Sequence, residues 1–314
     1  MLPASVGFLL RVSTLPESRP VLDRATSVGF IGAGKLGSSL AKVMAERDYN
    51  VILVARRDAK VAADAAAGVV GAEPTTDAQR VATECAIIFV TTSDAAISDV
   101  TNRVDWSSVD AVVHCSGATP VSVLMSAFEA GAVIGGWHPM QTFPSSHMRN
   151  HFKGVTVAIE SESPELFSWL ETLAANLGAR SFRLNASDRA AYHASAVMAC
   201  GLVAGLTGLA ADMWTTFGMT REDGLNALAP LVTQTGGQIE RLGVPGAITG
   251  PYVRGDVETV RSHLAVTSAA GVDIGQAYAA LALAHLPIAN EQGNISSEDY
   301  ATIEALLRAA TRQR

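Results

Sequence analysis

The sequence predicts an α/β fold, namely a doubly wound parallel sheet followed by an all-helical C-terminal domain. Strand-like and helix-like segments alternate from Ser27 to about Met140, and a glycine-rich turn joins the first strand to the first helix. From Asn185 onward the pattern is helical only. A chain of 314 residues also suggests about two domains. We therefore expect a flexible tail at residues 1–26, a sheet domain at 27–184 and a helical domain at 185–314.

The first predicted strand ends in a loop with the spacing G-x-G-x-x-G. Apolar residues 28–31 precede the loop, and a helix is expected from Leu36 to Arg47. In such a loop the first glycine allows a tight turn, the second lets backbone approach a pyrophosphate, and the third lets the helix pack on the sheet. The helix start attracts phosphate. This context favours a dinucleotide site over an incidental turn, with the residues Gly32, Ala33, Gly34, Lys35, Leu36 and Gly37.

The second predicted strand, residues 51–54, is followed by Arg56 and Arg57. NAD-binding domains place an acidic residue here to hold the ribose hydroxyls, whereas an arginine accommodates a 2′-phosphate. The sequence therefore predicts NADP(H) as the cofactor. The alternative is that the two arginines only cap a solvent-facing turn.

Two later loops complete the predicted nucleotide site. In a doubly wound sheet, ligands bind beyond the carboxyl ends of the strands, near the switch point. The strand at residues 86–90 leads to Thr91, Thr92 and Ser93, and Asp94 is expected to cap the next helix. The strand at residues 111–113 leads to Ser116 and Gly117, which either face the nicotinamide ribose or form a plain tight turn. Between the second predicted strand and the strand at residues 86–90, we expect a helix at 59–67 and a third strand beginning at Val69-Val70.

A histidine follows the next apolar segment, residues 133–136, inside Trp137-His138-Pro139-Met140-Gln141-Thr142-Phe143. His138 could donate a proton or bind a carboxylate beside the cofactor. A structural histidine with satisfied hydrogen bonds explains the pattern equally well.

The second half of the chain adds two strands and then only helices. The strands are expected at 154–160 and 179–184, with a helix at 164–177 between them; the later helices are expected at about 188–217, 221–242, 257–270, 274–286 and 297–312. Within the first of these, Ala194 to Ala211 is apolar enough to suggest a membrane span. Because Ser195, Cys200 and several glycines interrupt it, a core or dimer-interface helix is the better interpretation.

Two groups of residues in this half could serve a substrate. His193 lies one helical turn before Val197 and could project toward an interdomain cleft. Arg254 offers a guanidinium fork to a carboxylate, and Asp256 can cap the helix that follows. The alternative for the second group is a capped loop with a surface ion pair.

Composition excludes several classes of protein. A net charge of −7 gives no general attraction to nucleic acid or to an anionic membrane. The three cysteines have no metal-ligand spacing, so we expect no metal site and regard them as reduced core thiols. The apolar stretch Phe8-Leu9-Leu10 is too short for a signal-peptide core. We therefore expect a cytoplasmic protein.

Several separated motifs together resemble one family. They are Phe30–Gly37, Thr91–Asp94, His114–Ala118, Trp137–Phe143, Tyr192-His193-Ala194 and Gly250–Asp256. The chain resembles the bacterial Rossmann-like oxidoreductases that carry the C-terminal domain of unknown function 2520. It is more distantly similar to pyrroline-5-carboxylate reductase, ketopantoate reductase and the F420-dependent NADP reductases.

The resemblance implies an NADPH-dependent reductase of a small oxo- or imino-acid, with ketopantoate as the leading specific substrate. His193, and after it His138, would protonate the product, Arg254 would hold the substrate carboxylate, and Asp256 would orient a neighbour. The helical half would supply a homodimer contact.

The chain also departs from the family pattern. Cys200-Gly201 stands where members often carry a Ser-Asn pair, and no lysine follows Lys153, although ordinary ketopantoate reductases use a lysine of the helical domain as proton donor. Two alternatives therefore stay open: an imine reductase like pyrroline-5-carboxylate reductase, and a non-catalytic NADP-binding sensor.

Overall fold

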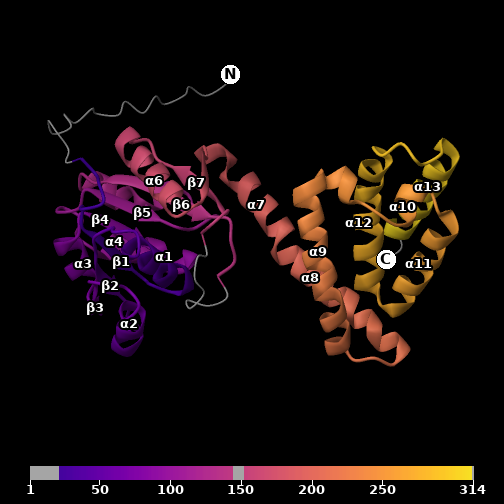
Figure 1. Ribbon diagram of the computed structural model, residues 1–314, viewed down its shortest axis with the longest axis horizontal. Coiled ribbons are helices and arrows are strands. Elements are labelled where there is room, and N and C mark those ends of the chain that lie inside the picture. Colours follow the sequence, from indigo (N-terminus) through magenta and orange to yellow (C-terminus); the bar gives the residue numbers. More distant parts are fainter. Residues whose placement is uncertain (1–20, 144–151, 313–314) are drawn as a thin grey trace, which may run out of the picture. The chain divides into compact units, whose positions relative to one another are not determined.

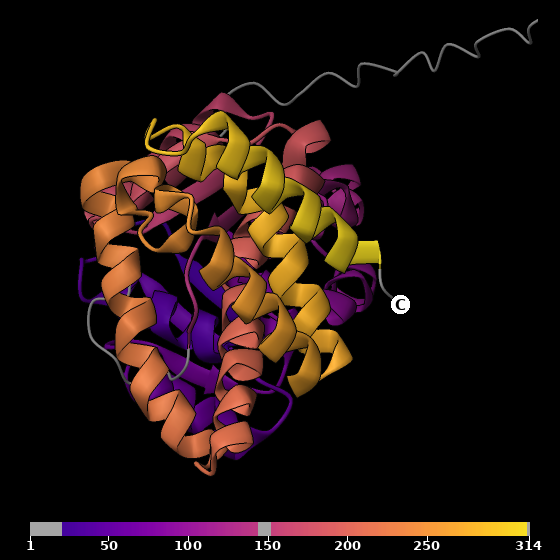
Figure 2. The same cartoon turned by 90° about the vertical axis from the view of Figure 1, so that its right-hand side faces the viewer.

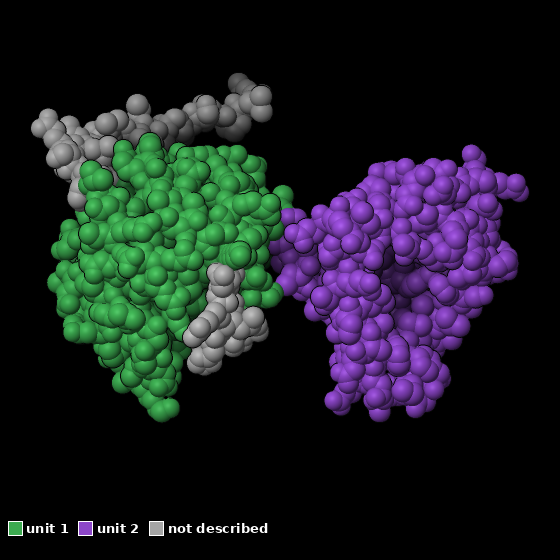
Figure 3. Space-filling view, viewed as in Figure 1, with its two compact units in different colours: residues 1–194 green, residues 195–314 purple. Residues whose placement is uncertain are grey.

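A computed structural model describes residues 21–143 and 152–312 (Figure 1). The chain divides into two compact units, with the boundary between Ala194 and Ser195 (Figure 3). Of the expected N-terminal tail, residues 1–20 lie outside the described part. In the remainder, the Asp23 carbonyl accepts a hydrogen bond from Trp169 Nε1 at 3.1 Å. This contact ties the segment before the first strand to the first unit.

The first unit contains an eight-stranded sheet of order β3-β2-β1-β4-β5-β6-β7-β8. Its strands are β1 (Val28–Ile31), β2 (Val51–Ala55), β3 (Glu73–Thr75), β4 (Ile87–Val90), β5 (Ala111–His114), β6 (Val133–Pro139), β7 (Thr156–Glu160) and β8 (Arg180–Arg183). Every neighbouring pair is parallel except β6 and β7, which are antiparallel. The order reverses between β1 and β4, as in a doubly wound sheet. The predicted fold class is confirmed, with one antiparallel junction.

Helices cover both faces of this sheet. They are α1 (Lys35–Ala45), α2 (Ala59–Ala66), α3 (Ala78–Glu84), α4 (Asp94–Arg103), α5 (Met125–Glu129) and α6 (Pro164–Asn176). Successive residues of a strand point to opposite faces; accordingly, Ile87 and Phe89 join one apolar cluster and Ile88 and Val90 the other. α1 and α6 pack in the first cluster, and α3, α4 and α5 in the second. Burial on both faces explains why β4 is apolar throughout.

Two local predictions in this unit are wrong. The third strand is Glu73–Thr75 and not Val69-Val70. Val69 instead lies buried beyond the end of α2. The cap position of α4 belongs to Ser93, and Asp94 is the first helical residue. At that place its carboxylate still complements the positive end of the helix.

The second unit is helical, as expected. Its elements are the part of α7 (Arg189–Ala199) that follows the boundary, then α8 (Gly201–Asp212), η3 (Met213–Phe217), α9 (Arg221–Ala247), α10 (Pro251–Arg254), α11 (Val257–Ala270), α12 (Val272–Asn290) and α13 (Ser297–Arg312). The single long helix expected at 188–217 is broken at Cys200, whose φ of −122° and ψ of −80° are not helical. α10 to α13 enclose an apolar core that includes Tyr252, Val260 and Leu286.

α8 and α9 lie side by side but are little covered (Figure 2). Among the described residues, only Gly208 and Ala211 of α8 and Gly224 of α9 are buried. Large apolar side chains are exposed along both helices, including Leu202, Leu206, Leu231, Ile239 and Leu242. Cys200 is exposed too, against the expectation of a core thiol, whereas Cys85 and Cys115 are buried.

Candidate functional site

Each glycine of the loop between β1 and α1 has a distinct structural role. Gly32 has a φ of +89°, and a Cβ there would overlap Thr92. A Cβ at Gly37 would overlap Thr91 Oγ1, so this glycine lets α1 pack against the end of β4. At Gly34 the nearest atom to an added Cβ is Arg56 Nη1, at 3.5 Å. The backbone at Gly34 is therefore open on the side where a ligand would approach.

The residues around this loop fit a dinucleotide. α1 begins at Lys35, so the amides of Lys35, Leu36 and Gly37 have no intrahelical acceptor. Thr92 Oγ1 is buried and has no hydrogen-bond partner. A buried hydroxyl without a partner costs free energy unless a ligand or water satisfies it. A nucleotide lying across Gly34 would give both the amides and the hydroxyl an acceptor.

The guanidinium of Arg56 lies beside the same loop. β2 ends at Ala55, and Arg56 N donates to Thr75 O at 3.0 Å, which fixes the backbone at this point. The Arg56 side chain is half-buried and reaches the Gly34 position, whereas Arg57 is exposed. A guanidinium next to the glycine loop is suited to a 2′-phosphate.

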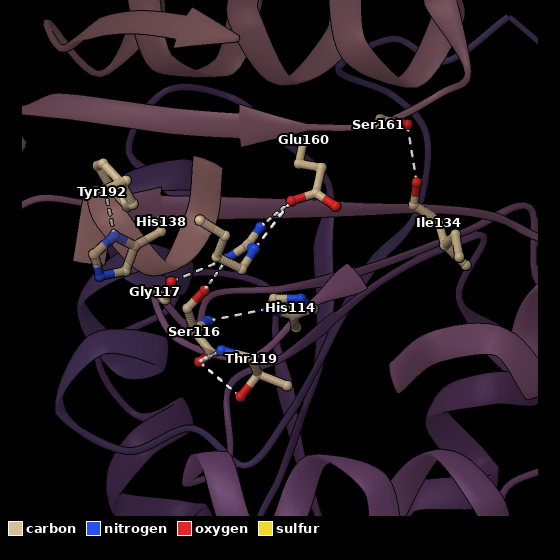
Figure 4. Close-up of polar contacts among 10 residues, drawn as sticks. His114, Ser116, Gly117, Thr119, Ile134, His138, Glu160, Ser161 and Tyr192 are labelled. Atoms are coloured by element: carbon tan, nitrogen blue, oxygen red, sulfur yellow. Dashed lines mark hydrogen bonds and ion pairs between the residues drawn. The ribbon is translucent and has the colours of Figure 1, made fainter. Parts of the chain in front are cut away.

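A second group of side chains gathers at the carboxyl ends of β5 and β6. His138 belongs to the end of β6, and Tyr192 and His193 are neighbours on α7. His138 Nδ1 lies 2.6 Å from the Tyr192 hydroxyl (Figure 4). The ring centroids of His138 and His193 are 6.1 Å apart. The structure thus brings together the two histidines that the sequence singled out, although 55 positions separate their numbers, 138 and 193.

Gly117 is the point at which the two imidazoles meet. A Cβ at this glycine would lie 2.7 Å from Cε1 and Nε2 of His138 and 2.7 Å from Cδ2 of His193. Any larger residue would therefore push the histidines apart. The loop after β5 is where a doubly wound sheet binds its ligands. The two histidines and the glycine together form a candidate reaction site.

Burial controls the charge of the groups in this cluster. Burial, with His193 and Arg189 nearby, lowers the pKa of His138 to about 4, and the carboxylate of Asp94 opposes this only in part. Burial also raises the pKa of Tyr192 to about 12. At neutral pH His138 is therefore an uncharged imidazole and Tyr192 an uncharged phenol.

Arg189 anchors the start of α7 to the sheet. Its Nε and Nη2 donate to Glu160 Oε2, at 3.0 and 2.5 Å, and Glu160 ends β7. Its Nη1 donates to the carbonyls of Ser116 and Gly117, at 3.0 and 3.2 Å (Figure 4). The side chains of Arg189 and Glu160 are only 5% and 11% exposed. One buried guanidinium thus links β7, the loop after β5 and the helix that carries Tyr192.

The Ser116 side chain is used within its own turn. Its hydroxyl donates to Thr119 Oγ1 at 2.9 Å and accepts from Thr119 N at 2.9 Å. Ser116 N donates to His114 Nδ1 at 3.1 Å. Burial, Arg189 and His138 lower the pKa of His114 to about 3, so this imidazole is neutral. The Ser116 hydroxyl is therefore bonded within a tight turn, which is the alternative to a contact with the nicotinamide ribose. Gly117 is the residue of this loop that faces the two histidines.

From the sequence, Tyr192 and Arg189 stand out only as neighbours of His193 in the segment Asp188–His193, without a role of their own, and Glu160 does not stand out at all. Tyr192 is the neighbour of His193 in the sequence, and Arg189 stands three positions before Tyr192. Arg189 and Tyr192 therefore lie on one turn of α7. That spacing was visible in the sequence. Glu160 gives no such signal, because only folding brings the end of β7 to α7.

Arg254 and Asp256, the other predicted substrate residues, belong to the second unit. Both carboxylate oxygens of Asp256 accept from Thr259, Oδ1 from its N at 3.0 Å and Oδ2 from its Oγ1 at 2.7 Å. Asp256 therefore caps α11, as predicted, and this capping lowers its pKa. Arg254 ends α10 with an exposed side chain.

Comparison with known families gives two matches, one in each half of the chain. Residues 27–116 match the family described as NADP oxidoreductase, coenzyme F420-dependent. Residues 155–285 match the domain of unknown function 2520. The resemblance inferred from the motifs is confirmed. No curated protein sequence matches the chain.

Several solved structures are similar. A Bacteroides fragilis protein, provisionally described as an NADP oxidoreductase, is 25% identical, with a TM-score of 0.63 over 92% of this chain and 99% of that one. Aspergillus terreus reductive aminase, solved with NADPH and ethyl-5-oxohexanoate, is 15% identical, with a TM-score of 0.55 over 92% and 94% of the two chains. Plasmodium falciparum pyrroline carboxylate reductase, solved with NADP, is 14% identical, with a TM-score of 0.54 over 92% and 98%. The last two likenesses show the fold alone.

Proposed function

We propose that this chain, which joins an NADP oxidoreductase-type domain to a domain of unknown function 2520, is an NADPH-dependent reductase of a small oxo-acid, with ketopantoate as its first candidate substrate. The observation that carries the proposal is the meeting of His138 and His193 at Gly117, at the same edge of the sheet as the glycine loop and Thr92. Proton-transfer groups beside a nucleotide site are what a reductase needs. A cytoplasmic location is part of this proposal.

NADPH would supply a hydride to the substrate carbon. Gly34, Thr92 and the start of α1 would hold the phosphates, and Arg56 the 2′-phosphate. The oxygen that gains negative charge would be protonated from His193, whose ring lies beside Gly117 in the loop after β5. Arg254 would hold the substrate carboxylate, and Asp256, by capping α11, would fix the junction between α10, which ends at Arg254, and α11.

The acid in this proposal cannot be the lysine of ordinary ketopantoate reductases, because the chain has no lysine after Lys153. An imine reductase is the second candidate, favoured by the fold shared with pyrroline carboxylate reductase and reductive aminase. A panel of 2-oxo acids, ketopantoate among them, and cyclic imines tests both by the loss of NADPH absorbance. Turnover of imines alone would select the second candidate. Tight NADPH binding without oxidation across the panel would favour a sensor and contradict the proposal.

Arg56 is expected to set the preference for NADPH over NADH. Arg56→Ala is expected to weaken NADPH binding roughly 10- to 100-fold, since a hydrogen bond to a charged group contributes about 1.5–3 kcal/mol. NADH binding should stay unchanged, because NADH lacks the 2′-phosphate. Fluorescence titration of the reduced nicotinamide measures both affinities. Arg103→Ala, which removes a surface arginine paired with Asp99, is the matched control. Equal loss of NADPH and NADH affinity in Arg56→Ala would contradict the role of Arg56.

The protein is expected to assemble as a homodimer. The uncovered apolar faces of α8 and α9 favour a homodimer through the helical domain, because exposed apolar patches of this kind mark interaction surfaces. By length and composition alone, the helical stretches Ala186–Phe217 and Val272–Asn290 could also cross a membrane, which is weak support for that alternative.

Sedimentation of the purified protein without detergent is expected to give twice the chain mass of 32.7 kDa. The double variant Leu202→Glu/Leu206→Glu should sediment as a monomer, because charges on α8 oppose its burial. Val70→Glu, at an exposed apolar position of the first unit, is the control and should stay dimeric. A monomeric wild type, or a protein that needs detergent, would contradict this interface.

A further inference from the structure

We propose that Tyr192 fixes the tautomer of His138, so that His138 presents its Nε2–H beside Gly117 as a neutral hydrogen-bond donor, distinct from the proton-donating His193. The catalytic role of His138 in this inference rests on the proposed function. The position of the hydrogen on the His138 ring does not depend on it.

The Tyr192 hydroxyl is held in place from two sides. Its ring packs edge-on against His138, with centroids 5.6 Å apart, and against Phe182, with centroids 5.7 Å apart. Three positions earlier on the same helix, the Arg189 guanidinium is fixed by Glu160. The phenol therefore reaches His138 Nδ1 from an anchored helix turn, at 2.6 Å.

The direction of this hydrogen bond follows from acidity. Burial keeps Tyr192 as a phenol and His138 as a neutral imidazole, with pKa values of about 12 and 4. A phenol O–H is a stronger acid than a neutral imidazole N–H, and an imidazole nitrogen is a stronger base than a phenol oxygen. The bond O–H···Nδ1 is therefore favoured over Nδ1–H···O. Because a neutral imidazole carries one N–H, the hydrogen of His138 lies on Nε2.

The charged and titratable groups around His138 support the neutral form. His193 and Arg189, both on α7, disfavour the imidazolium, and Asp94 on α4 favours it. His114 on β5 is close enough to interact electrostatically and is itself neutral. Burial, the largest influence, also disfavours the charge. The surroundings thus keep His138 uncharged at neutral pH.

The Nε2 edge of His138 faces the loop after β5. A Cβ at Gly117 would lie 2.7 Å from Nε2, so the N–H is presented at the ligand-binding edge of the sheet. A neutral imidazole N–H can polarise a carbonyl without giving up its proton. His138 would stabilise the oxygen that becomes negative, and His193 would supply the proton. Tyr192 acts through His138 and is a positioning residue.

The test is a two-bond ¹H–¹⁵N spectrum of the protein labelled at histidine nitrogens, with His138 assigned by its loss in His138→Gln. We expect the Nε2–H tautomer for the wild type, without titration between about pH 5 and pH 8. In Tyr192→Phe both tautomers should be populated and the pKa of His138 should rise, because the bond accepted by the neutral ring is lost. Tyr49→Phe, which removes a phenol bonded to Asn176 in the same unit, should leave the spectrum unchanged.

An Nδ1–H tautomer in the wild type would overturn the inference, as would an unchanged His138 spectrum in a folded Tyr192→Phe protein. The wild-type measurement needs no variant, so a misfolded Tyr192→Phe protein still leaves the test decisive. If the protein turns over a substrate, Tyr192→Phe should lower kcat roughly fivefold to tenfold at unchanged NADPH affinity. The spectra need no substrate. The absence of turnover in the substrate panel and an Nδ1–H tautomer in the spectra are therefore separate results.

Discussion

Replacing Arg189 with methionine is expected to lower the free energy of unfolding by about 3–5 kcal/mol, because removal of one partner leaves a buried carboxylate uncompensated. Glu160 would lose both of its bonds to the guanidinium, and the carbonyls of Ser116 and Gly117 would lose a donor. Urea unfolding followed by tryptophan fluorescence measures the effect, since Trp106, Trp137 and Trp169 are all buried in the first unit.

Two variants separate this effect from a general loss of charge. Arg80→Met removes an exposed arginine paired with Glu73 and Glu84, and should cost less than about 1 kcal/mol. Arg189→Met/Glu160→Gln removes both charges of this pair and should regain part of the loss. If Arg189→Met cost no more than Arg80→Met, the guanidinium would not be the anchor of α7.

Substitution of His193 by alanine is expected to reduce turnover about 10²- to 10⁴-fold, the usual contribution of a positioned proton donor. NADPH affinity should be unchanged, because in the proposed site the glycine loop, Thr92 and Arg56 would hold the nucleotide, and His193 would not. The measurement is steady-state kinetics on any accepted substrate, beside a fluorescence titration with NADPH.

Added imidazole should restore part of the turnover of the alanine variant, since it can fill the space and carry the proton. His193→Gln, which is similar in size but has no imidazole, should be as slow as His193→Ala. Normal turnover in either variant would remove His193 from the mechanism and leave its neighbour His138 as the remaining candidate.

The parts of the fold that could be predicted are those in which burial dictates the residues. β1, β2, β4 and residues 111–113 of β5 are almost wholly buried in a sheet covered on both faces, and they contain no polar residue. β3 has only three residues, none of them buried, so no apolar pattern marks it. The break at Cys200 was not predicted although Gly201 follows it, because an isolated glycine is tolerated inside a helix and no proline stands there.

Part of the candidate site could also be predicted from the sequence, and part of it could not. The glycine loop, Arg56 and the two histidines are visible in sequence, because local spacing or residue type points to their chemistry. The contact of Tyr192 with His138, and the bridge from Arg189 to Glu160, join segments far apart in the chain. Only the sheet order and the docking of α7 on it bring these residues together.

The central claim is that this chain transfers a hydride from NADPH to a small carbonyl or imine compound. The most direct test is mass spectrometry of products formed with NADPH deuterated at the transferring carbon, with deuterated NADH as the control. We predict a product with one deuterium from NADPH and little or none from NADH. Tight NADPH binding with no labelled product from any oxo-acid or imine would contradict the claim and indicate a nucleotide-binding protein without this chemistry.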